Sequence, residues 1–138
     1  MASLRLRRAH ELMRFARRLL PCLLVLSSAS LPAARMIIQR SPLAGFTHHA
    51  APEVWARLSE GDRVELALDS RNPHDSQAVQ VHWQGRLLGY LPRQDNGALA
   101  RALHQGLPLE ARISRLRPHP DPRQRIEIEV SALAAHGG

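Results

Sequence analysis

The sequence predicts a mostly β fold with one or two short helices, arranged as a small closed or partly closed β-barrel. Between about residues 36 and 131 there are five or six short runs in which apolar and polar residues alternate, as in half-buried strands. One segment, residues 95–105, instead repeats its apolar residues at helical spacing. With 138 residues, the chain is long enough for one ordinary domain and too short for two.

The expected elements follow one another with turn residues between them. Residues 35–45 form an extended segment interrupted by Pro42, and residues 52–58 form one or two helical turns that end towards Gly61. Asp95 or Asn96 can cap the later helix, and Gly106 suits its end. Strands are expected over residues 63–69, 78–83, 87–91, 109–116 and 125–131.

The positive charge lies mainly at the amino terminus. The net charge is +7, and all 19 basic residues are arginine. Residues 1–35 hold seven arginines and one acid and carry +6, whereas residues 36–138 hold twelve arginines and eleven acids and carry +1. A basic domain face is the usual footprint of a nucleic-acid binder. Such a face here requires that the arginines of the domain be segregated in space.

Residues 1–34 have the order of a secretory signal peptide. An arginine-rich stretch precedes an apolar run at residues 19–26, and small residues typical of a cleavage site follow. The run is far shorter than the ~20 residues of a membrane span, so we expect no transmembrane helix. We favour a periplasmic or secreted location; the alternative is a non-native leader and translation from Met36, giving a cytoplasmic domain. Residues 36–133 then form the domain and residues 134–138 a flexible tail.

Two polar motifs carry most of the functional information: Asn72-Pro73-His74-Asp75, and the run from Gly89 through Tyr90 to Arg93. Turn chemistry alone interprets the first as a structural hairpin loop, because Asn and Asp side chains bond nearby backbone amides and Pro presets one dihedral angle. In the second motif, the structural interpretation is that Tyr90 packs at a sheet edge and Arg93 is solvated.

Together with two further segments, these motifs resemble the HIRAN domain family over about residues 41–130. The segments follow one another in the order and spacing of the family: Leu43-Ala44-Gly45, Gly61-Asp62, Asn72-Pro73-His74-Asp75-Ser76-Gln77-Ala78-Val79 and Gly89-Tyr90-Leu91-Pro92-Arg93. The resemblance implies a small modified OB-like or SH3-like β-barrel. It also implies nucleic-acid binding, with capture of single-stranded DNA at its 3′ end.

The resemblance further implies a set of binding residues. Asp75 would hold the terminal hydroxyl, since a carboxylate accepts a hydrogen bond from a hydroxyl but repels a phosphate. Arg93 would contact phosphate. His48 and His74 stand where DNA-binding relatives place aromatic stackers, and Thr47 stands where they have a basic residue. Stacking is worth about 1–3 kcal/mol per base and tolerates any sequence. The full set is His48, Asn72, His74, Asp75, Tyr90 and Arg93.

Catalysis, metals and cofactors are not expected. The chain has no lysine and hence no phosphate-binding P-loop, and its single cysteine, Cys22, precludes an intramolecular disulfide and a cysteine-based zinc site. Hydrolase activity and zinc in the family belong to segments of larger relatives. The resemblance implies a helicase or repair partner. The alternative is an exported envelope module that has kept the fold but not DNA-end recognition.

Overall fold

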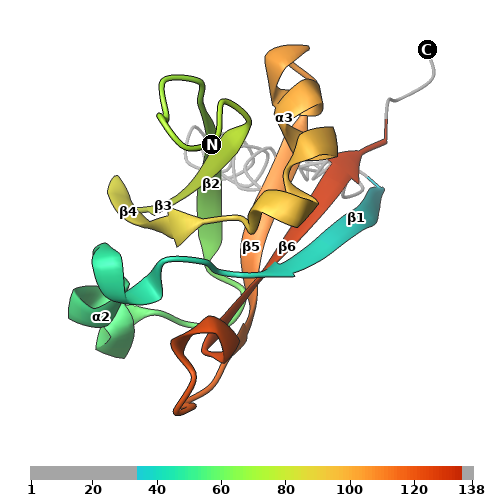
Figure 1. The fold of residues 1–138 in the computed structure, drawn as a ribbon. Helices are drawn as coiled ribbons and strands as arrows, with labels where there is room; N and C mark the ends of the chain where they lie inside the picture. The colour runs from blue at the N-terminus through green and yellow to red at the C-terminus, as the bar shows by residue number, and fades with distance from the viewer. Residues whose placement is uncertain (1–33, 135–138) are drawn as a thin grey trace, which may run out of the picture. The chain divides into compact units, whose positions relative to one another are not determined.

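One antiparallel sheet of six strands, in the order β1-β6-β5-β2-β3-β4, organises the domain (Figure 1). The computed structural model describes residues 34–134, so the predicted leader and tail lie outside the described residues except for Ala34 and Ala134. The strands are β1 (Arg35–Pro42), β2 (Arg63–Asp69), β3 (Ala78–Trp83), β4 (Arg86–Tyr90), β5 (Leu109–Leu116) and β6 (Ile126–Leu133).

Two short α-helices and four 3₁₀ turns complete the described fold. Helix α3 packs against β2 and β3, whereas α2 contacts β4 and lies well apart from α3 (Figure 1). The helices are α2 (Ala51–Val54) and α3 (Gly97–His104), and the turns are η1 (Phe46–His48), η2 (Trp55–Arg57), η3 (Arg93–Asp95) and η4 (Pro122–Gln124).

Strand β2 changes partner along its length. Its first residues, Arg63 and Val64, pair with β5, and residues 65–69 pair with β3. The two outer strands share no ladder among the described residues; Ala44, just after β1, meets Tyr90 at the end of β4 in one isolated bridge. The mostly β prediction with short helices is therefore confirmed, while barrel closure is not detected.

The core lies where the alternation of the sequence places it. Val79, Val81, Ile113 and Ile128 are fully buried, and Leu99 of α3 packs among them. Each such side chain contributes about 1.5–3 kcal/mol by its burial. The exposed large hydrophobic side chains of the described range are Met36, Ile37, Ile38 and Leu107.

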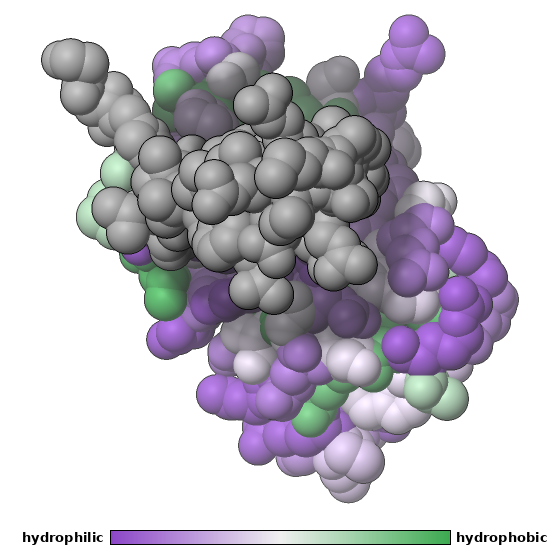
Figure 2. Space-filling view, turned by 180° about the vertical axis from the view of Figure 1, so that it is seen from behind, coloured by the Kyte–Doolittle hydropathy of each residue, from purple (hydrophilic) through white to green (hydrophobic). Residues whose placement is uncertain are grey.

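Seen from behind, the visible surface of the described residues is mostly hydrophilic, with small separate hydrophobic patches (Figure 2). No helix between residues 34 and 134 is long and apolar enough to cross a bilayer.

Candidate functional site

The β2–β3 loop owes its shape to Asn72. The side-chain carbonyl oxygen of Asn72 accepts the backbone N–H groups of His74 (2.9 Å) and Asp75 (3.2 Å). This is the local side-chain to backbone bonding that makes Asn a turn residue. The structural interpretation of the motif is therefore correct for Asn72. The Asn72 side chain fixes the backbone that carries His74 and Asp75.

The carboxylate of Asp75 is held from both sides. Its Oδ1 accepts the backbone N–H of Gln77 at 2.9 Å, and its Oδ2 accepts the side-chain amide of Asn96 at 2.7 Å. The hydrogen bond from Asn96, then that from Gln77 and the nearby charge of Arg93, keep the pKa of Asp75 below its usual value. Asp75 is half-buried and is thus a fixed, ionised acceptor at neutral pH.

Tyr90 belongs to a second polar group at the end of β4. Its hydroxyl donates to Asp69 Oδ2 (3.3 Å), and the Gln80 amide donates to the same carboxylate (3.3 Å) and lies 3.4 Å from the Tyr90 oxygen. The Asn72 amide, 3.5 Å from Asp69 Oδ2, connects this group to the loop of Asp75. The two sequence motifs therefore share one polar surface.

A histidine ring packs against Tyr90. The rings of His49 and Tyr90 lie 5.4 Å apart at an interplanar angle of 57°. Burial, with a smaller effect of the His48 charge, lowers the pKa of His49, so its imidazole is neutral at pH 7. Of the predicted stackers, His48 and His74 are both exposed, and it is His49 that contacts Tyr90.

Gly89 explains why the segment after β1 reaches the site. A side chain at Gly89 would overlap the carbonyl oxygen of Ala44 and press on Leu43. Ala44 and Tyr90 exchange backbone hydrogen bonds of 2.8 and 2.9 Å at this crossing. The absence of a Cβ therefore lets two backbones approach closely and carries His48 and His49 to the end of β4.

The Gly61-Asp62 motif has a structural role. Asp62 Oδ2 accepts the indole N–H of the buried Trp83 at 3.0 Å and the backbone N–H of Ser59 at 2.9 Å. A buried indole donor needs such a partner. These two hydrogen bonds account for an acidic residue at position 62 without any contact to a ligand.

Asn96 and His49 are site residues that the sequence did not identify. Asn96 precedes α3, where an Asn normally caps the helix, but it forms no side-chain cap and instead turns its amide to Asp75. Only 2% of its surface is exposed, which distinguishes it from an ordinary cap. Arg93 is exposed in η3, close enough to influence Asp75. Across residues 34–134, no three His, Cys, Asp or Glu side chains converge as a possible metal site.

Comparisons with known proteins agree with this architecture. The family model of the HIRAN domain matches residues 38–133. A crystal structure of a protein from Lactobacillus plantarum has a TM-score of 0.63 and 23% identity, covering 74% of this chain and 98% of that one. The crystal structure of the HIRAN domain of human HLTF has a TM-score of 0.53 and 17% identity, covering 72% and 78%. No curated protein matched in sequence.

Proposed function

This chain belongs to the HIRAN domain family, and we propose that its domain binds single-stranded DNA and recognises a free 3′-hydroxyl end with the β2–β3 loop. The proposal assigns a binding module without intrinsic catalysis. Its partner would be a DNA 3′ end and, in the alternative in which translation starts at Met36 and the domain stays in the cytoplasm, also a helicase or repair protein that supplies such ends.

The single observation that carries the proposal is the fixed carboxylate of Asp75. Each of its oxygens already accepts one hydrogen bond, and a carboxylate has about four acceptor positions, so further ones remain for a ligand donor. The lowered pKa keeps the group an acceptor only. A sugar hydroxyl satisfies such a group, whereas a terminal phosphate would place negative charges side by side.

Arg93 supplies the complementary charge. Its guanidinium is exposed and near Asp75, and a guanidinium binds phosphate oxygens in a bidentate manner. A hydroxyl acceptor beside a phosphate donor matches the chemistry of the last nucleotide of a strand. The exposed rings of His48 and His74, and the His49–Tyr90 pair, offer surfaces for base stacking.

For the location, we propose export, because residues 1–34 have the order of a signal peptide. Export would direct the same surface to DNA outside the cytoplasm or to another acidic ligand. Amino-terminal sequencing of the native protein distinguishes the alternatives: a mature chain beginning near Arg35 supports export, and one beginning at Met36 with its initiator methionine contradicts it.

The proposed end recognition is tested with two fluorescent oligonucleotides of one sequence, one ending in a 3′-hydroxyl and the other in a 3′-phosphate. Fluorescence anisotropy should show about tenfold or greater preference for the hydroxyl, since one hydrogen bond to a charged group is worth roughly 1.5–3 kcal/mol. Equal binding of both, or binding of neither, would refute the proposal.

A further inference from the structure

Arginines gather on the outer face of the sheet. Between residues 35 and 134 the sequence has thirteen arginines and eleven carboxylates. Five of these arginines and three carboxylates line two hollows of about 370 and 170 Å³, which meet at Gly61 and Arg112. The arginines are Arg35, Arg40, Arg63, Arg112 and Arg115; the carboxylates are Glu110, Glu127 and Glu129. This arginine face thus carries +2, and the remaining eight arginines and eight carboxylates of the range balance.

The strand register aligns four of these charges in one row. Arg40 of β1 pairs with Glu129 of β6, Glu129 with Arg112 of β5, and Arg112 with Arg63 of β2. Directly paired residues point to the same side of a sheet. Since neighbouring strands are about 4.8 Å apart, the row extends over roughly 14 Å, which is long enough for more than one phosphate of a nucleic-acid strand.

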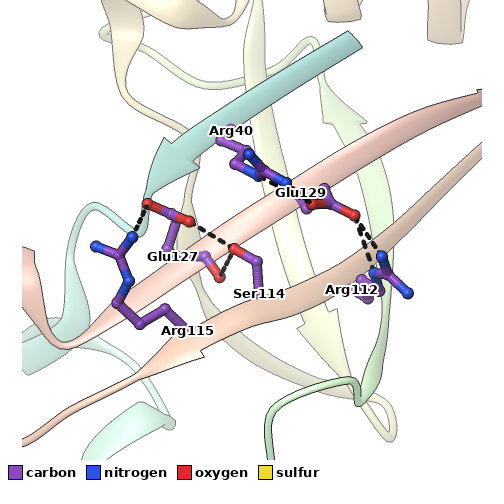
Figure 3. Close-up of polar contacts among 6 residues, drawn as sticks. All are labelled: Arg40, Arg112, Ser114, Arg115, Glu127 and Glu129. Carbon is purple, nitrogen blue, oxygen red and sulfur yellow. Dashed lines mark hydrogen bonds and ion pairs between the residues drawn. The ribbon is translucent and has the colours of Figure 1, made fainter. Parts of the chain in front are cut away.

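Glu129 immobilises two arginines of the row (Figure 3). Its Oε2 accepts a hydrogen bond from Arg40 Nε at 2.9 Å and lies 2.8 Å from Arg40 Nη2 in an ion pair, and its Oε1 accepts hydrogen bonds from Arg112 Nε and Nη2 at 3.0 and 2.7 Å. Glu129 is only 3% exposed, whereas the arginine side chains are 55% and 49% exposed. One carboxylate therefore fixes two guanidinium groups whose side chains remain about half exposed.

Two further arginines of the face are weakly compensated. Arg63 is exposed and forms no ion pair with any of the described residues, although it lies opposite Arg112. Arg115 approaches Glu127 only to 3.6 Å, and Glu127 also accepts the Ser114 hydroxyl (Figure 3). Like charges directly opposite each other destabilise a sheet. The Arg63–Arg112 pair is thus an arrangement that folding alone does not favour.

We infer that the arginine face is a second nucleic-acid contact, which binds the phosphate backbone of a strand independently of its end. The inference rests on the proposed function in taking nucleic acid as the partner, but it uses none of the residues around Asp75. Charge complementarity supports it, because five arginines and only three carboxylates line the two hollows. Fixed guanidinium groups bind phosphates with little loss of side-chain entropy.

The test uses a circular single-stranded DNA, which has phosphates but no 3′ end. The full chain and its Arg63→Gln and Arg63→Gln/Arg115→Gln variants are titrated by anisotropy at several salt concentrations. Each lost phosphate contact should make the negative slope of log K against log salt less steep by about 0.7. This corresponds to a roughly fivefold loss of affinity at 0.1 M salt. Arg63→Gln should also unfold at the same or a higher temperature, since it removes a like-charge pair.

A matched control keeps the same loss of charge away from the face. Arg101→Gln/Arg123→Gln removes exposed arginines of α3 and η4 and should keep the wild-type slope. The inference is overturned by wild-type binding in the Arg63→Gln/Arg115→Gln variant, by an equal loss in the control, or by failure of the wild type to bind the circle. A loss of 3′-hydroxyl preference with normal binding of the circle would instead refute end recognition.

Discussion

The side-chain amide of Asn96 donates a 2.7 Å hydrogen bond to the carboxylate of Asp75, 21 positions earlier in the chain. This contact joins the residue before α3 to the β2–β3 loop. Because Asn96 is buried, the hydrogen bond is shielded from water and holds Asp75 in one orientation. The position of the proposed hydroxyl acceptor thus depends on packing far from it in sequence.

Replacing Asn96 by alanine should destabilise the domain by about 1–3 kcal/mol, because it removes a buried partner of a charged group. Urea denaturation measures this loss. Gln77→Ala is the matched control: the backbone N–H of Gln77, which binds Asp75, remains in that variant. Equal stability of the two variants would contradict a positioning role of the Asn96 amide.

The Gly89→Ala variant should be destabilised by at least about 1–3 kcal/mol, since the added methyl group overlaps the backbone of Ala44. Gly97→Ala, at the start of α3, meets only ordinary contacts of 3.6 Å or more and should be neutral or up to about 1 kcal/mol more stable. Thermal melts of both variants distinguish a requirement for close approach from a general effect of glycine replacement. Similar melting temperatures would refute the requirement.

The acid sensitivity of the domain should depend on Glu129. Hydrogen bonds from Arg112 and then Arg40 lower its pKa below the usual 4.5. A carboxyl group with a lowered pKa adds stability above about pH 4.5, which is lost as the pH falls through the lower value of the folded state. Glu129→Gln should therefore be less stable than wild type at pH 7, with the difference shrinking as the pH falls below about 4.5.

The control for this prediction is Glu65→Gln, which removes an exposed carboxylate on β2. Its stability should follow the pH profile of the wild type. If the Glu129→Gln profile also ran parallel to that of the wild type, the two arginine contacts would add no pH-dependent stability.

Local patterns in the sequence identified most of the fold. The alternating strand expected over residues 78–83 is confirmed, and its apolar residues Val79, Val81 and Trp83 are buried, because one face of the strand packs on the core. The strand expected over residues 125–131 extends instead over Ile126–Leu133, since pairing with both β1 and β5 continues past Ser131. The expected closure of the sheet into a barrel is not detected, because alternation does not reveal whether the two outer strands pair.

The site was less accessible to sequence reasoning. The motifs placed Asn72, Asp75 and Tyr90 on strand ends and a loop, and the structure brings these three into two linked polar groups. The partner of Asn96 was not predictable, because its position before a helix is equally typical of a cap. The arginine face was also hidden, since its charges come from four strands that no local pattern relates.

The central claim is that Asp75 distinguishes a 3′-hydroxyl from a 3′-phosphate. The most direct test is the ratio of the two affinities in wild type, Asp75→Asn and Arg93→Gln, each measured by anisotropy. We expect Asp75→Asn to bring the ratio close to one, because a neutral amide no longer repels the phosphate. Arg93→Gln should weaken binding of both oligonucleotides while the preference for the hydroxyl remains. An Asp75→Asn variant that is folded and keeps the wild-type ratio would contradict the account.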